Sequence, residues 1–322
     1  MTAVPAKPRG TWLAKVPVLR ELRQSVGVQR FMLLVGVIIT LVYILVALLA
    51  PVIAPYRFNQ LQDASGTFPG SAAPSATHLW GTTIAGYDVL SRTLYASQTA
   101  LMAIVAAVII SLIIGVLLGL FSGYFGGPLD RILVVVCDAI YAFPSLLLAI
   151  VISIMLSRGQ SSLWSGIMAA ALSISVVYVP QYFRVVRSEV VRIKAEAYVE
   201  SAKVIGAGNG RVLFVHVLRN SVRTLPLIIT LNAVDAFETL AGLGFLGLGI
   251  EPSSAAEWGY DLQKAVSDVT AGIWWTALFP GLAIVLLALG ISLLGEGLND
   301  LADPRLRRRS AEANEAALEL EA

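Results

Sequence analysis

The sequence predicts an all-α, polytopic membrane protein with six transmembrane helices, and three observations lead to this fold class. Of its 322 residues, 57% are hydrophobic and 14% are charged, with a mean hydropathy of +0.78. A soluble domain of this length normally carries about 25% charged residues. The apolar residues gather in uncharged runs of roughly 19 to 37 residues, long enough to cross a bilayer. Finally, the Lys and Arg residues concentrate in the segments that would lie on one side of the membrane.

The first part of the chain predicts one span between two polar segments. Residues 1–30 carry six basic residues against Glu21 alone, and we expect a cytoplasmic segment. The uncharged run 31–56 is longer than the apolar region of a secretory signal, so we expect an uncleaved first transmembrane helix. Residues 57–92 form a polar extracytoplasmic loop that is too long to be a simple connector.

Residues 93–303 are expected to form a core of five further helices. The predicted spans are 93–129, 132–157, 165–183, 224–248 and 274–295. A cytoplasmic loop at 184–223 and an extracytoplasmic segment at 251–274 separate them, and residues 304–322 form a cytoplasmic tail. Small residues at every fourth position allow helices to approach closely in lipid, which predicts a packing role for Gly115, Gly119, Gly123 and Gly127.

The basic residues set the orientation of these spans. In this topology, 19 of the 23 Lys and Arg residues lie on the side of the two termini, and 4 lie on the opposite side. Cytoplasmic segments of membrane proteins carry such an excess. Both termini and the loop 184–223 are therefore assigned to the cytoplasm.

The cytoplasmic loop 184–223 predicts a short amphipathic helix that another protein could grip. Its apolar residues recur at spacings of three and four and would form one stripe, with charged residues opposite. The turn at residues 206–210 is rich in glycine, and a second helix can begin at Arg211. A plain solvated loop is the alternative. The expected stripe consists of Val191, Ala195, Tyr198, Ala202 and Ile205.

No residue pattern in the chain indicates catalysis or metal binding. The phosphate loop G-x-x-x-x-G-K-[ST] is missing, and the G-x-G-x-x-G match that begins at Gly242 lies at the end of a span, without a βαβ unit. The single cysteine, Cys137, excludes a cysteine-built metal site. His78 and His216 fall on opposite sides of the membrane in this topology. We therefore expect no enzyme activity, no metal and no bound cofactor.

Four polar residues inside the predicted spans are candidates for a translocation path. Carboxylates in hydrocarbon must face a bundle interior or water. The candidates would therefore line a polar conduit or relay protons, and they are Asp138, Asn232, Asp235 and Glu238. The alternative is that they form hydrogen bonds with neighbouring spans or lie near the interface. Asp235 and Glu238 share a helix face.

Several motifs together resemble the second membrane subunit of bacterial dipeptide/oligopeptide ABC importers, over nearly the whole chain. Glu200-Ser201-Ala202 with Gly206 looks like the E-A-A-x-x-x-G signature of importer permeases, and His216-Val217-Leu218 continues it. The further matching blocks are Pro74-Ser75, His78, Gly81-Thr82, Asp88 to Arg92, Ala142-Phe143-Pro144, Glu238, Gly244 to Gly249, Trp258-Gly259, Trp274-Trp275, Pro280-Gly281 and Asp303-Pro304.

The chain also departs from this family pattern at four positions. Arg219 stands where the signature usually has proline. Thr83 replaces an aspartate, Tyr87 replaces an arginine, and Gln98 stands where arginine is common. The last three lie at or near the outer loop, so they affect the substrate assignment more than the fold.

The resemblance implies a permease of the type I importer architecture in a bacterial plasma membrane. It implies a second homologous permease subunit, two cytoplasmic ATPase subunits that hold ATP and Mg²⁺, an extracytoplasmic solute-binding protein, membrane lipid and no nucleic acid. The outer segments 57–92 and 251–274 would meet the binding protein. Coupling to the ATPases would be carried by Glu200, Ser201, Ala202, Gly206, Arg211 and His216.

Three alternatives to a peptide importer stay open from the sequence. The same importer class could carry a nickel chelate, haem or glutathione. A secondary transporter could use the carboxylates of Asp138, Asp235 and Glu238 as a proton relay, although no convincing internal repeat is visible. A structural membrane scaffold is the third alternative.

Overall fold

The computed structural model describes residues 28–156, 163–248, 250 and 254–302, and these confirm the prediction of an all-α chain with several membrane spans. Among the described residues, five helices are long and apolar enough to cross a bilayer, and a bent helix pair makes up to six. The long helices are α2 (Val28–Ile53), α3 (Val89–Phe125), α6 (Leu163–Ile193), α10 (Leu225–Phe245) and α12 (Trp275–Ala302).

The chain divides into two compact units, residues 1–40 with 289–322 and residues 41–288. In the first unit, the start of α2 packs against the end of α12 through glycines. A Cβ atom at Gly297 would lie 2.9 Å from the Cβ of Leu33, and one at Gly36 would collide with the backbone of Leu294. Small residues thus bring these two helices into backbone contact.

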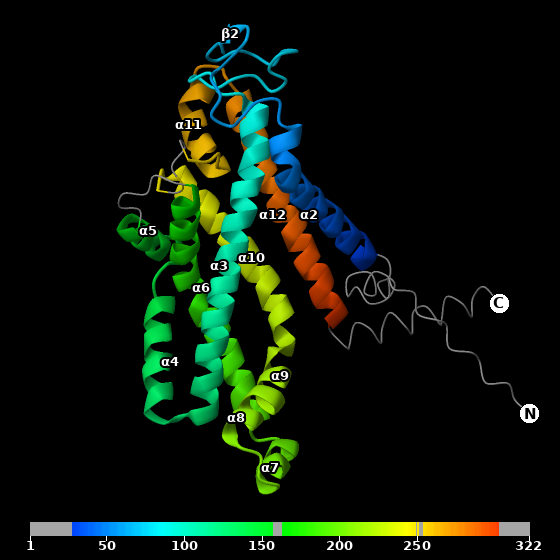
Figure 1. Cartoon of the computed structure of the whole chain (residues 1–322), viewed down its shortest axis with the longest axis vertical. Helices are drawn as coiled ribbons and strands as arrows, with labels where there is room; N and C mark the ends of the chain where they lie inside the picture. The colour runs from blue at the N-terminus through cyan, green and yellow to red at the C-terminus, as the bar shows by residue number, and fades with distance from the viewer. Residues whose placement is uncertain (1–27, 157–162, 249, 251–253, 303–322) are drawn as a thin grey trace, which may run out of the picture. The chain divides into compact units, whose positions relative to one another are not determined.

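In the second unit, α3 and α6 share the most extensive helix contact and run side by side (Figure 1). Glycines on α3 lie directly against the α6 backbone. A Cβ at Gly119 would approach the Phe183 carbonyl oxygen to 2.8 Å, and one at Gly123 would approach the Arg187 carbonyl oxygen to 2.9 Å. A Cβ at Gly115 would collide with Tyr182. Larger residues here would force the two helices apart.

The packing role predicted for Gly127 is wrong, because α3 ends at Phe125. Gly126 and Gly127 both have positive φ angles, 67° and 69°, which glycine adopts easily. The chain reverses there, and Pro128 occupies the first turn of α4 (Gly127–Tyr141). A Cβ at Gly127 would have no heavy atom within 4 Å.

The span predicted at 132–157 is broken in two. Helix α4 ends at Tyr141, and α5 (Ser145–Leu156) begins after Pro144 at an angle of 97° to it. The residue before a proline avoids the helical conformation, which explains the break. Arg187 on α6 anchors α4 by donating two hydrogen bonds to Asp130, at 2.6 and 2.7 Å.

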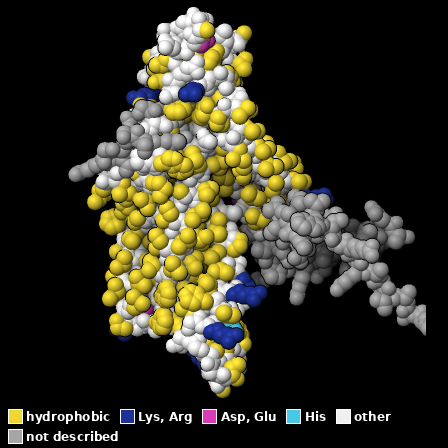
Figure 2. Space-filling view, viewed as in Figure 1, with side chains coloured by type: hydrophobic (Ala, Val, Ile, Leu, Met, Phe, Trp, Pro, Cys, Tyr) yellow, Lys and Arg dark blue, Asp and Glu magenta, His cyan; other side chains and the backbone are white. Residues whose placement is uncertain are grey.

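The exposed surface of the second unit matches a membrane environment. On the face drawn in Figure 2, hydrophobic side chains cover the region of α3, α4 and α6, while Lys and Arg side chains appear mainly toward its two ends. Exposed apolar residues on α3 include Val105, Ile109 and Ile113. Water-exposed helices rarely carry such continuous apolar surface.

The segment 57–92 folds onto the start of α3 and α11 (Trp258–Thr270). It contains a hairpin of two short strands, β1 (Gln62–Asp63) and β2 (Gly66–Thr67). The buried Arg92 side chain donates to Asp261 with a shortest distance of 2.6 Å and to the Phe58 carbonyl at 3.2 Å. Trp275 Nε1 donates to the Thr82 carbonyl at 3.0 Å. These polar contacts fix the loop on the helices.

Within the G-x-G-x-x-G match, Gly244 serves packing between α10 and α11, whereas Gly242 faces Leu146 on α5. A Cβ at Gly244 would collide with the Glu257 carboxylate, and one at Gly259 would collide with the Ala241 carbonyl. Glu257 begins α11, where its carboxylate accepts hydrogen bonds from the N–H groups of Gly259 and Tyr260, both at 2.8 Å. A side-chain oxygen in this position stabilises the helix N-terminus.

The buried Glu257 carboxyl should make stability depend on pH. Burial raises its pKa from 4.5 to about 7, against the opposing effect of the two N–H donors. Between these values the folded chain binds more protons than the unfolded chain, so the free energy of unfolding should fall as pH rises, by about 3 kcal/mol across the window.

Thermal unfolding in detergent at pH 4.5 to 8 measures this effect, with Glu257→Gln as the comparison. We expect the unfolding temperature of the wild type to fall relative to that of the variant as the pH rises to ~7. Above this pH the difference between the two temperatures should stay constant. Parallel curves for the two proteins would show that the carboxyl is ionised across the whole range.

Candidate functional site

The end of the second unit that carries α7 (Ala197–Val204) presents an apolar tip. Val204 and Ile205 have 86% and 85% of their surface exposed, at the point where α7 ends. Gly206 follows with a φ of 89°, a left-handed conformation that favours glycine and turns the chain away. Two branched apolar side chains so strongly exposed at one helix end form a small apolar patch on the surface.

The opposite side of α7 is anchored in the bundle. Val199 and Ala202 are buried. Val199 belongs to a hydrophobic core that joins the end of α6 to the segment after the glycine turn. Core residues from those elements include Val190, Val212 and Val217. A force applied to the apolar tip would therefore pass directly to α6 and to the helix that follows.

The single stripe predicted for this loop is wrong, because α6 continues to Ile193 and a turn separates it from α7. Val191, Tyr198 and Ile205 are exposed, and of the predicted stripe only Ala202 is buried. The apolar spacing continues across the break between α6 and α7, so it does not correspond to one helix face. Charged pairs such as Arg192 with Glu189, at 2.7 Å, extend α6 instead.

The second helix begins at Asn209, not at Arg211, and runs continuously into α10. It passes through α8 (Asn209–Arg211), a π-helical turn (Val212–Val217), α9 (Leu218–Ser221) and a 3₁₀ turn (Val222–Thr224). A π-helical turn is rare and frequently lies at functional sites. Here the Asn220 amide donates to the His216 carbonyl at 2.7 Å and to the Tyr198 hydroxyl at 3.1 Å, which links the turn to α7.

The residues expected to couple to an ATPase lie around this tip. Glu200, Ser201, Gly206 and Arg211 are exposed, His216 is half-buried, and Ala202 is buried. Arg219, which departs from the family pattern, is exposed on α9.

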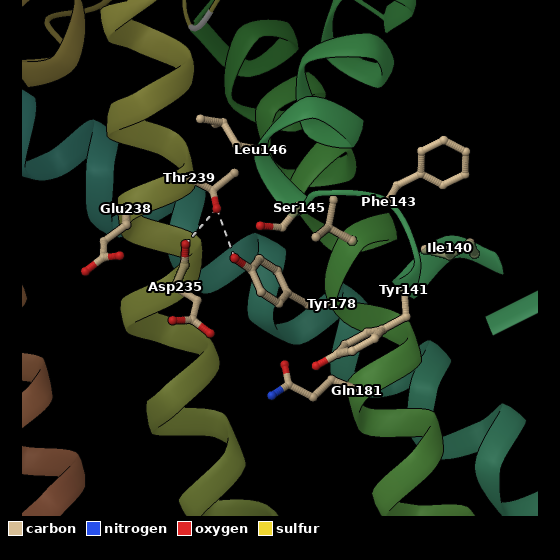
Figure 3. Close-up of a pocket in the computed structure, with 11 residues that line it drawn as sticks. Ile140, Tyr141, Phe143, Ser145, Leu146, Tyr178, Gln181, Asp235, Glu238 and Thr239 are labelled. Carbon is tan, nitrogen blue, oxygen red and sulfur yellow. Dashed lines mark hydrogen bonds between the residues drawn. The ribbon is translucent and has the colours of Figure 1, made fainter. Parts of the chain in front are cut away.

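A cavity of about 580 Å³ opens where α4 breaks from α5 (Figure 3). Its walls come from α6 and α10 as well as from the break. The Tyr178 hydroxyl and the Thr239 hydroxyl are joined by a hydrogen bond of 2.9 Å. The side chain of Asp235 extends into the space between α10 and α6, whereas Glu238 points to the other side of α10, at the rim.

Of the four translocation-path candidates, only Asp235 and Glu238 line this cavity. Asp138 lies on α4 below it, where it accepts a hydrogen bond from Arg184 at 2.7 Å. Asn232 is 1% exposed, and within the described residues its amide makes no hydrogen bond of normal geometry. It lies beside the Tyr182 hydroxyl, which is also buried without a hydrogen bond of normal geometry.

Sequence reasoning missed the aromatic and amide side chains of the cavity. Tyr141, Tyr178 and Gln181 line it, but each looks like an ordinary interior residue of an apolar run. The signal available was Pro144, because a proline that breaks a span leaves room between helix ends.

A second cavity of about 390 Å³ lies between the outer loop and α11. Two positions that depart from the family pattern, Thr83 and Tyr87, are part of its lining. The Arg92 guanidinium lies 5.1 Å from the centre of the Tyr87 ring, a cation–π distance. Within the described residues, no group of three or more His, Cys, Asp or Glu side chains could hold a metal ion.

Comparison with known proteins identifies the family. Residues 115–308 match the model of the binding-protein-dependent transport system inner membrane component. The chain belongs to this family. It is therefore a multi-pass membrane subunit of a transport system, in agreement with the resemblance seen in its motifs.

Curated relatives cover most of the permease. A putative peptide transport system permease protein of Brucella suis biovar 1 is 34% identical over 84% of this chain and 88% of its own length. The glutathione transport system permease protein GsiD of Shigella flexneri serotype 5b is 36% identical over 87% of this chain and 88% of its own length.

The unsatisfied amide of Asn232 leads to a stability prediction. Replacing a buried polar group that lacks partners with an apolar side chain of similar size removes its desolvation penalty, about 1–3 kcal/mol. Asn232→Leu should therefore raise the thermal unfolding temperature of the permease in detergent. Thr239→Val, which breaks the hydrogen bond to Tyr178, is the control and should lower it. A lower unfolding temperature for Asn232→Leu would mean that the amide has a partner.

Proposed function

We propose that the chain is the transmembrane permease subunit of an ATP-driven ABC importer for short peptides, forming half of the translocation pore. The proposal includes a second homologous permease subunit, two cytoplasmic ATP-binding cassette subunits and an extracytoplasmic solute-binding protein. In this proposal the chain itself performs no catalysis and binds no cofactor. ATP and Mg²⁺ bind to the ATPase subunits. Both termini and the loop with α7 lie in the cytoplasm.

The apolar tip at Val204 and Ile205 is the observation that carries this proposal. A transport subunit without a nucleotide site must receive work from a partner. The tip is fully exposed at its end and anchored at its base by Val199 and Ala202, so a partner that grips it can move α6 and α10. Family membership supports the identity of that partner as an ATPase.

The relatives favour peptide cargo. One is named a peptide transport permease and the other a glutathione transport permease, and glutathione is itself a tripeptide. Short peptides are therefore a cargo class that agrees with both names. We therefore assign short peptides, including glutathione, as the cargo class.

Val204→Ser with Ile205→Ser tests the coupling role. Burying a Val or Ile side chain contributes about 1.5–3 kcal/mol, so the double variant should weaken ATPase retention by at least about tenfold. Co-purification of the ATPase and uptake of labelled tripeptide in proteoliposomes measure the effect. We expect both to be lost while membrane insertion is unchanged. Val266→Ser, which changes an exposed apolar residue on α11, should keep the ATPase bound.

Two further variants address the family signature. Gly206→Leu places a side chain at a φ of 89°, and Glu200→Lys reverses an exposed charge on α7. Normal uptake and normal ATPase retention by the double variant and by both of these variants would refute the coupling role. Uptake that survives ATP depletion but collapses with the proton gradient would favour a secondary transporter instead.

A further inference from the structure

We propose that the cavity at the break between α4 and α5 receives the ammonium group of the cargo, with Asp235 as its anionic partner. This inference rests on the proposed function and adds a recognition site within the membrane-spanning part of the chain. It concerns a cationic amino group carried on a small organic body, as at the N-terminus of a peptide.

The charge around the cavity is negative and unbalanced. Within the described residues, no ion pair involves Asp235 or Glu238. Arg184 lies 4.3 Å from the centre of the ring of Tyr141, a lining residue, but it pairs with Asp138 at 2.7 Å. A carboxylate within a membrane-spanning helix is costly and needs a counter-charge or water. A bound cation supplies that counter-charge.

The remaining walls suit an ammonium ion better than a metal ion. Tyr141 and Tyr178 present aromatic surface to the cavity, and aromatic faces attract organic cations. Gln181 and Ser145 offer neutral oxygen atoms that can accept N–H donors. In Figure 3, Asp235 on α10 faces the Tyr178, Tyr141 and Gln181 side of the cavity.

The volume of the cavity also suits a small organic molecule better than a bare ion. A space of about 580 Å³ is within the range of small-molecule sites, roughly 300–1,000 Å³. Apolar residues such as Ile140, Phe143 and Leu146 complete the lining and would contact the body of the ligand. Glu238, on the other side of α10, adds to the negative charge of this region.

The chain offers a direct chemical probe of this site. Its only cysteine, Cys137, is buried. Ser145→Cys in a Cys137→Ser background therefore places a single thiol on the cavity wall with little change in size. The rate at which this thiol reacts with a cationic and with an anionic methanethiosulfonate reagent reports the local charge. The measurement uses the full chain with the subunits that co-purify.

Asp235→Asn is the test variant, and Asp63→Asn, which removes an exposed carboxylate in the outer hairpin, is the matched control. We expect the cationic reagent to react faster, and the ratio of the two rates to fall about tenfold in Asp235→Asn but not in Asp63→Asn. An unchanged ratio in Asp235→Asn would overturn the proposal.

Protection by a peptide tests recognition of the amino group itself. Trialanine should slow labelling of the cysteine at least fivefold, N-acetyl-trialanine should not, and Asp235→Asn should abolish the difference. Equal protection by the two peptides, or protection by neither, would overturn the ammonium site. These outcomes are separate from failure of the proposed function. That failure would appear as a wild-type chain that retains no ATPase, or as normal ATPase retention and uptake by Val204→Ser with Ile205→Ser, whatever the labelling at position 145.

Discussion

The structure depends first on the backbone contact between α3 and α6. Gly119 and Gly123 bring the two helices together so closely that a single added carbon would meet a carbonyl oxygen at 2.8–2.9 Å. In lipid, where apolar side chains gain little from leaving the solvent, such contact is a main source of helix association. Helix α6 carries both Tyr178, which lines the cavity, and core residues that pack against α7. The contact with α3 therefore holds the cavity and the apolar tip of α7 at a fixed distance.

Ion pairs then determine which other elements are held to α3 and α6. Asp130 and Asp138 fasten α4 to α6 through Arg187 and Arg184, so α4 follows α6. Arg92 of α3 pairs with Asp261 of α11 and donates to the Phe58 carbonyl, which ties the outer loop to both helices. Helix α10, by contrast, meets α6 through the Tyr178–Thr239 hydrogen bond and the unsatisfied pair of Asn232 and Tyr182. Among the described residues, the α6–α10 contact therefore has fewer side-chain hydrogen bonds than the α4–α6 contact.

The sequence predicted what depends on composition and local pattern, and missed what depends on breaks and on three-dimensional contact. The all-α membrane fold and the close packing at Gly115, Gly119 and Gly123 follow from uncharged runs and helical spacing. The errors at Gly127 and along the stripe from Val191 to Ile205 arose because a helical period was continued across a turn. Gly126-Gly127-Pro128 carries a break signal that could have prevented the first error. The cavity could not be predicted, because Tyr141 and Gln181 reach it only through the 97° bend between α4 and α5.

The account requires that the tip of α7 touch the ATPase, and site-specific cross-linking measures this most directly. Ile205→Cys in the Cys137→Ser background places a single thiol of this chain at a strongly exposed position of the tip. A short thiol-directed cross-linker, applied to the complex in membranes, should join this residue to an ATPase subunit, with the adduct identified by mass spectrometry. An ATPase that co-purifies with the chain but forms no adduct from position 205 would contradict the coupling account.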